Sequence, residues 1–297
     1  MNGEWLFGNL EKEYFRQLLR RVAEFTGAFI ITHTILSNHF HVLLMIPQRV
    51  LVDDDELLRR YAVLHPIPSK YGESIDVMQA KLAKNGPEGQ ALRKRLHALM
   101  YDLSQFSKLL KQNFSIWFND THDRFGPLWS ERFGSVLLEA GEPVRNVAAY
   151  IDLNCVRAGI VKDPAHYRFC GYAEAVAGSE IARNGLMALG LAPSGTWNET
   201  QAGYRVLLYA IGSGARAHGV VIADEDYRKV IEEGGELTLP VRFACKIRHF
   251  TAGAVLGSRL FVEEQLTRYR QRHGPCLRTR PRAIPDLLTL MTLKSPR

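Results

Sequence analysis

Apolar positions near the start of the chain first follow helical spacing and then change to strand-like runs. Between residues 10 and 25, apolar side chains recur every three or four positions, which predicts an amphipathic helix ending at the glycine that follows. The segments AFIITHTILS (28–37) and NHFHVLLMIP (38–47) are rich in apolar and β-branched residues, which predicts two strands joined by a turn at Ser37-Asn38. The opening pattern therefore predicts a helix followed by a β-hairpin.

The texture changes to a helical one after the hairpin. Nothing strand-like occurs in the next three stretches, which are the acidic run DDDELLRR, the proline-containing HPIPSKYGES and QALRKRLHALM. We therefore expect an inserted helical subdomain over about 48–100. The next segment, YDLSQFSKLLKQNFSIWFN, predicts a helix with Lys108 and Lys111 on its polar face. Residues 128–140, LWSERFGSVLLEA, are a strand candidate.

A helix with marked ends is predicted over residues 142–159, EPVRNVAAYIDLNCVRAG. A proline stands where a first helical turn tolerates it, and a glycine stands where a helix stops. Tyr150 and Asn154 are four positions apart and therefore share a face, whereas Asp152 points elsewhere. A tyrosine in the middle of a helix is most often a packing residue, so this pattern alone does not define a site.

Composition divides the chain near residues 178–195, which we interpret as a linker between a first region, 1–177, and a C-terminal region, 196–297. The second region is predicted to be all-helical. Its segment RHFTAGAVLGSRLFVEEQLTRYRQRHG suggests helix, turn and helix, with Ser258 as an N-cap, which fits a helix-turn-helix and equally any small helical bundle. The tail carries arginines suited to phosphate contacts or to a solvated end: Arg268, Arg270, Arg272, Arg278, Arg280 and Arg282.

Composition narrows the class of protein. A hydrophobic content of 46% without an apolar tract near twenty residues predicts a soluble globular chain with no membrane partner. The start lacks a basic leader before an apolar block, so we expect a cytoplasmic location. The cysteines never form Cys-x-x-Cys, which predicts reduced structural thiols. A net charge of +7 favours a polyanionic partner, with nucleic acid as the leading candidate. Nothing indicates a protein partner.

Two histidines stand two positions apart in the second predicted strand. Alternation along a strand puts His39 and His41 on the same face, as a metal half-site requires. The ordinary alternative is a pair of partly buried imidazoles bonded to backbone carbonyls, which is the commoner outcome for such a short motif.

Taken together, the histidine pair, the downstream tyrosine with an amide at i+4 and the basic charge resemble the HUH single-tyrosine transposases. The stretches LSNHFHVLL, LSQFSKLLKQNFSIWFN, GPLWSERFGSVLLE and YIDLNCVRAGIVKDPAHYRFCGY resemble the branch of REP-associated tyrosine transposases. The resemblance covers residues 2–172 well, and RHFTAGAVLGSRLFVEEQ resembles the C-terminal extension of some members. It implies an α+β fold with a ferredoxin-like βαββαβ palm. We add the helical insertion and the all-helical C-terminal region to that fold.

The resemblance also implies a site and a reaction. Tyr150 is the expected nucleophile, and His39, His41 and Asn154 are the expected ligands of a divalent metal, Mg or Mn. The substrate class is single-stranded or hairpin-forming repeat DNA, which is cleaved and rejoined through a 5′-phosphotyrosine. The alternative is a domesticated, catalytically impaired DNA-binding protein of the same family. Replication initiators and relaxases, the third interpretation, rank lowest because they typically carry a second tyrosine or a third histidine near the pair.

Three departures from the family pattern are visible. Where relatives have a run close to YIHLNPVRAG, this chain has Asp152 and Cys155 in place of histidine and proline. Without the proline, we expect the helix to continue through Cys155. The first strand of the palm, usually carrying a YHxxxR-like sequence, has no counterpart after Met1, so either the palm lacks this strand or the start lies upstream.

Candidate DNA contacts complete the sequence-based picture. For phosphate contacts we expect Arg132, Arg157, Lys108 and Lys111, and for base stacking we consider Trp117, Phe118 and Trp129. Each has an ordinary alternative, because aromatic side chains usually belong to the core and surface cations usually contact nothing.

Overall fold

The computed structural model describes residues 7–66, 73–84, 86–130, 133–212, 228, 232, 253–274, 280–284 and 287–294. Helices combined with small sheets confirm the predicted α+β class. The chain divides into two compact units, which are described separately. The first comprises residues 1–30, 35–39 and 44–132, and the second comprises residues 31–34, 40–43 and 133–297.

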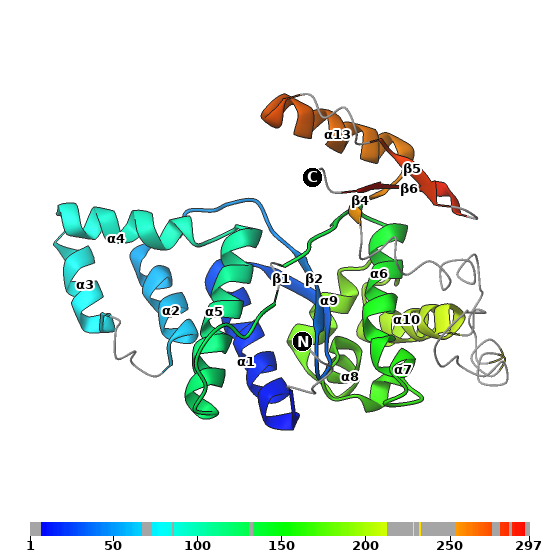
Figure 1. The fold of residues 1–297 in the computed structure, drawn as a ribbon, viewed down its shortest axis with the longest axis horizontal. Helices are drawn as coiled ribbons and strands as arrows, with labels where there is room; N and C mark the ends of the chain where they lie inside the picture. The colour runs from blue at the N-terminus through cyan, green and yellow to red at the C-terminus, as the bar shows by residue number, and fades with distance from the viewer. Residues whose placement is uncertain are drawn as a thin grey trace. The chain divides into compact units, whose positions relative to one another are not determined.

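Helices dominate the first unit (Figure 1). Helix α1 packs against both α2 and α5, and the segment expected to be helical, 48–100, forms α2, α3 and α4 where it is described. Gly27 ends α1 in the left-handed conformation that glycine adopts readily (φ 72°). The bounds are α1 Asn9–Thr26, α2 Asp54–Leu64, α3 Ile75–Ala83, α4 Pro87–Ala98 and α5 Leu103–Thr121.

An aromatic cluster forms part of the core of this unit. Phe7 lies against Phe114 at a ring-centroid distance of 5.0 Å, and Phe15 lies against Phe114 at the same distance. Both contacts are edge-on, the arrangement that the ring quadrupole favours. Phe15 belongs to α1 and Phe114 to α5, so their contact packs the two helices together through the apolar face of each.

The predicted β-hairpin is confirmed as strands β1 (Phe29–Ile35) and β2 (Phe40–Met45), which pair in a two-stranded sheet. The amide of Leu36 donates to the carbonyl of His39 at 2.8 Å and closes the turn. Residues 31–34 of β1 and 40–43 of β2 belong to the second unit. These residues of the hairpin contact α6, the helix that carries Tyr150, through Thr32, Thr34 and His41.

The second unit continues with a short strand and a series of helices. Helix α6 ends at Asp152 and α7 begins at Asn154, so the predicted helix is interrupted at Leu153 even without a proline. The bounds are β3 Leu137–Leu138, α6 Glu142–Asp152, α7 Asn154–Arg157, a 3-10 turn Pro164–His166, α8 Gly171–Val176, α9 Glu180–Met187 and α10 Trp197–Gly212.

The linker predicted at 178–195 is wrong in part, because α9 lies within it. Ser179 caps this helix by accepting a hydrogen bond from the amide of Ala182, and Leu186 is fully buried. Gly178 and Gly190 flank the helix, whereas Gly185 lies within it. Gly178 (φ 104°) and Gly190 (φ 61°) adopt backbone angles that other residues rarely take.

The C-terminal region is not all-helical, which corrects the prediction. The segment expected to open a helix-turn-helix includes strand β4 (Gly253–Gly257), which pairs with β6 (Leu287–Lys294), and β5 (Arg282–Ile284) pairs with β6 in turn. Helix α13 (Arg259–His273) packs against β4 and β6 (Figure 1), and Ser258 is its N-cap as predicted. Short apolar runs are compatible with either structure, and here Val255 and Leu293 meet Val262 and Leu266 in one small core.

The strand candidate at 128–140 is reduced to β3, which runs parallel to β4 at the edge of this sheet. Among the described residues, β1 and β2 are the members of a separate two-stranded sheet. No helix of the described part is long and apolar enough to cross a bilayer.

Candidate functional site

His41 and Tyr150 lie beside each other in the second unit, although more than one hundred residues separate them in the sequence. Their ring centroids are 6.1 Å apart, and the planes meet at 74°, an edge-on contact. Strand β2 supplies His41, and the last turn of α6 supplies Tyr150. Tyr150 is 7% exposed, and His41 is half-buried. The structure thus brings together two of the predicted site residues.

Arg157 contacts the same tyrosine. The carbon of its guanidinium group lies 4.0 Å from the centroid of the Tyr150 ring, and its Nη1 donates to the backbone carbonyl of Tyr150 at 2.9 Å. A guanidinium within about 6 Å of an aromatic face is attracted by the ring quadrupole. Arg157 was predicted as a phosphate contact, and in the structure it is engaged with Tyr150.

Asn154 begins helix α7 and is buried (7% exposed). Its amide nitrogen donates to the carbonyls of Tyr150 at 3.2 Å and Ile151 at 3.3 Å. Because these bonds use the nitrogen, they fix the amide plane and leave its oxygen as the atom for other interactions. An amide oxygen is a common ligand for hard divalent cations, so the side chain fits the predicted role in its chemistry.

His39 precedes β2 and belongs to the first unit, so its participation beside Tyr150 stays a prediction. Its Nδ1 lies 2.7 Å from Oδ1 of Asn38. A proton on Nδ1 would satisfy this bond and leave a lone pair on Nε2, the usual arrangement in a metal-binding imidazole. Desolvation by the surrounding protein lowers the pKa of His39 and so favours the neutral form that binds metals.

The predicted metal ligands are two imidazoles and one amide. In the described part of the chain, no cluster of three or more His, Cys, Asp or Glu side chains has the geometry of a metal site. The predicted set contains only two residues of these types, the two imidazoles, and takes its third ligand from an amide. His41 contacts the ring of Tyr150, and Asn154 bonds to its backbone carbonyl.

Asp152 is an organising residue that the sequence did not identify as important. It is fully buried, and its carboxylate accepts hydrogen bonds from the hydroxyls of Thr32 (2.9 Å) and Tyr204 (2.6 Å) and from the amide of Tyr172 (3.1 Å). Burial raises the pKa of Asp152 to about 6, and these hydrogen bonds oppose the rise. The carboxylate joins the tyrosine helix to β1, α8 and α10.

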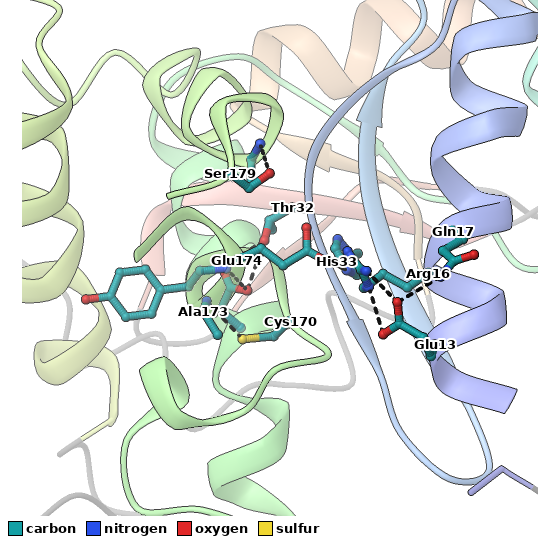
Figure 2. Close-up of polar contacts among 12 residues, drawn as sticks. Glu13, Arg16, Gln17, Thr32, His33, Cys170, Ala173, Glu174 and Ser179 are labelled. Carbon is teal, nitrogen blue, oxygen red and sulfur yellow. Dashed lines mark hydrogen bonds and ion pairs between the residues drawn. The ribbon is translucent and has the colours of Figure 1, made fainter. Parts of the chain in front are cut away.

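The alternation of Thr32, His33 and Thr34 along β1 is the sequence pattern that could have predicted these contacts, because it places the two threonines on one face of the strand. Thr34 donates to the carbonyl of Ile151 at 2.6 Å, so both threonines bond to α6. His33 points to the other face, where its Nε2 lies 3.5 Å from a carboxylate oxygen of Glu174, and both side chains are buried. Figure 2 shows Thr32 and His33 beside Glu174 and Cys170.

The remaining DNA-contact candidates have separate outcomes. Lys108 is exposed on α5, while the Nζ atom of Lys111 lies 5.1 Å from the centroid of the Trp129 ring. Arg132 lies outside the described residues. Phe118 is 3% exposed and belongs to the aromatic core, so it is not placed to stack on a base.

Trp117 and Trp129 are only partly buried. Trp117 stacks on Tyr14 at a centroid distance of 3.8 Å. The indole nitrogen of Trp129 donates to the carbonyl of Lys111 at 3.0 Å, and its ring lies 5.8 Å from that of Phe114. Both tryptophans therefore have contacts within the first unit, and their stacking on a base stays a prediction.

No family model, curated protein or solved structure matches the chain. The assignment of a function therefore rests on the residues of this chain and on the motifs that they form.

Proposed function

We propose that this protein is a metal-dependent, single-tyrosine DNA transposase and endonuclease. It cleaves and rejoins single-stranded, hairpin-forming repeat DNA, as the resemblance to REP-associated tyrosine transposases implies. The observation that carries the proposal is the contact between His41 and Tyr150, with ring centroids 6.1 Å apart. These two motif residues are far apart in the sequence. A catalytic nucleophile and a ligand of the metal that assists it must lie close together, and the contact meets this requirement.

In the proposed reaction, the hydroxyl oxygen of Tyr150 attacks the phosphorus of a phosphodiester. A bond forms between that oxygen and phosphorus as the bond to the 3′ oxygen breaks. The 3′ oxygen leaves with the electron pair and takes up a proton, while the phenol loses one, so the charge on the phosphate is unchanged. The product is a 5′-phosphotyrosine and a free 3′-hydroxyl. Because the phosphoester bond is conserved, the strand can be rejoined without ATP.

Different residues of the protein would bind the metal, position Tyr150 and attract the DNA. His41, Asn154 and His39 would hold a Mg²⁺ or Mn²⁺ ion, which when bound supplies Lewis-acid activation of the phosphate. Buried hydrogen bonds from Thr32 and Tyr204 to Asp152 fix the helix that presents Tyr150. The exposed Lys108 and the regions around Lys111 and Arg132 would attract the DNA backbone. We assign the hairpin β1–β2, with α1 before it, to a ferredoxin-like palm.

The test is incubation of the purified protein with labelled hairpin DNA and Mn²⁺ or Mg²⁺, followed by denaturing electrophoresis. We expect a covalent adduct that requires metal and that disappears in Tyr150→Phe. Tyr172→Phe is the matched control, because this buried tyrosine lies in the same unit and is not the proposed nucleophile. An adduct that persists in Tyr150→Phe, or no adduct with any hairpin substrate, would contradict the proposal.

The burial of Tyr150 favours a second candidate, the catalytically impaired DNA-binding relative. With 7% of its surface exposed, the tyrosine offers a phosphate little access. This alternative predicts tight hairpin binding in gel-shift assays, no adduct under any metal condition, and equal binding by Tyr150→Phe and the unmodified chain.

A further inference from the structure

We infer that Arg157 is a positioning residue for Tyr150, holding the phenol ring in the orientation from which its hydroxyl attacks. This inference rests on the proposed function for its catalytic consequence. It is an alternative to the role predicted from the sequence, in which Arg157 contacts a DNA phosphate.

Two contacts fix Arg157 relative to both parts of Tyr150. The guanidinium carbon lies 4.0 Å from the ring centroid, and Nη1 donates to the backbone carbonyl of the same residue at 2.9 Å. A planar guanidinium that is bonded at one edge and stacked on its face has little remaining freedom. The ring it covers cannot turn about its side-chain bonds without losing this contact.

His41 restricts the same ring from β2, through an edge-on contact with centroids 6.1 Å apart. Tyr150 is therefore contacted both from the hairpin and from α7. The turn at Leu153 between α6 and α7 brings Arg157, seven positions along, back toward the carbonyl of Tyr150. A nucleophile confined in this way reacts faster, because orientation is established before the substrate binds.

The contacts of Arg157 with the carbonyl and the ring of Tyr150 favour a positioning role, and its guanidinium has further N–H donors besides Nη1. Lys108, by contrast, is exposed on α5. Loss of a phosphate contact weakens DNA binding and lowers its salt dependence, whereas loss of a positioning residue lowers the rate for bound DNA.

The experiment compares Arg157→Met, Arg157→Lys and the control Arg168→Met in the full-length chain. Arg168 is matched because its guanidinium carbon lies 5.0 Å from the centroid of another aromatic ring, that of Phe169, in the same unit. The readouts are the single-turnover cleavage rate at saturating hairpin DNA, the dissociation constant at several salt concentrations, and the melting temperature.

For Arg157→Met we expect the rate to fall by about 10- to 100-fold, as small misplacements of reacting groups do, with the dissociation constant and its salt slope unchanged. Arg157→Lys should recover part of the rate, and Arg168→Met should match the unmodified chain. A weaker dissociation constant with a salt slope smaller by about 0.7, the value for one phosphate on a single strand, would overturn the inference. So would an unchanged rate, or a fall in rate that only follows a lower melting temperature.

A second measurement separates this inference from the proposed function. Fluorotyrosine is incorporated, and the ¹⁹F signal of residue 150 is assigned by its absence in Tyr150→Phe. We expect Arg157→Met to shift or broaden this signal and Arg168→Met to leave it unchanged. If no DNA is cleaved but the signal moves, the proposed function fails and the positioning contact stands. If the signal does not move, the positioning inference fails whatever the cleavage assay gives.

Discussion

The hydroxyl of Thr32 lies 2.9 Å from each carboxylate oxygen of Asp152, across 120 positions of sequence. Both side chains are fully buried, so the bond is made where water cannot replace it. It joins the middle of β1 to the end of the helix that carries Tyr150. Together with the hydrogen bond from Thr34 to the carbonyl of Ile151, it fixes the position of that helix relative to β1. The proposed nucleophile depends on this attachment for its place beside His41.

Thr32→Val should destabilise the protein by about 1–3 kcal/mol, the cost of removing a donor from a buried charged acceptor. Thr34→Val is the control, because it removes a bond from the same strand to a neutral carbonyl and should cost less, about 1 kcal/mol. Urea unfolding followed by circular dichroism measures both. Equal losses for the two variants would show that the charge on Asp152 contributes little.

The pH dependence of stability should carry the signature of Asp152. Because burial raises the pKa of Asp152 from 3.8 to about 6, the folded protein holds this proton more tightly than the unfolded chain. The stabilisation is complete below pH 4 and is lost as the pH rises through about 6, an effect of about 3 kcal/mol at full size.

Asp152→Asn isolates this effect from the other titrating groups. Urea unfolding at each pH gives the unfolding free energy of both proteins. Relative to the variant, the unmodified protein should become less stable as the pH rises from 4 to 7.5. A difference that is flat across this range would mean that Asp152 titrates at its ordinary pKa in the folded state.

Gly171 should resist substitution by alanine. An added Cβ would overlap the hydroxyl of Thr32 and lie 3.1 Å from the amide nitrogen of His33. The Thr32 hydroxyl cannot move aside freely, because Asp152 holds it. We expect Gly171→Ala to destabilise the protein by about 1–3 kcal/mol, as overpacking does, and Gly134→Ala, where nothing lies within 4 Å, to change stability by less than about 0.5 kcal/mol. Thermal melts of both variants test this, and equal melting temperatures would contradict it.

Lys108→Gln should weaken hairpin binding without changing the rate at saturating DNA. If the exposed ammonium group neutralises one phosphate, the slope of log affinity against log salt should fall by about 0.7 for a single strand. Lys81→Gln is the control in the same unit, because Lys81 already pairs with Glu73 at 2.8 Å. Fluorescence anisotropy between about 50 and 200 mM salt measures both slopes. Identical slopes for the two variants would remove Lys108 from the DNA-binding surface.

Local pattern predicted most of the first half of the fold. The helix at α1, the hairpin and the long helix α5 follow from regular spacing of apolar residues, and Gly27 and Ser258 have the capping roles expected of them. The β-structure around residues 253–294 could not be predicted in the same way. A run such as Ala254-Val255-Leu256 is apolar without alternation, and only its pairing with β6, more than thirty residues away, decides that it is a strand.

The candidate site was predictable only as separate parts. Sequence spacing identified Tyr150, Asn154 and the histidine pair, but the contact of His41 with Tyr150 depends on how β2 meets α6. The role of Asp152 was not visible, because a single carboxylate in a helix reveals neither its burial nor its three donors. The contact of Arg157 with the ring and carbonyl of Tyr150 was not predictable either, because it depends on the turn at Leu153.

The most direct measurement is identification of the residue that becomes joined to DNA. The protein is incubated with Mn²⁺ and a hairpin oligonucleotide, the DNA is digested to its terminal nucleotide, and the tryptic peptides are sequenced by mass spectrometry. We predict a nucleotide attached through its 5′ phosphate to Tyr150, and no such peptide when the metal is chelated. A nucleotide on any other residue, or only unmodified Tyr150 in samples that bind the hairpin, would contradict it.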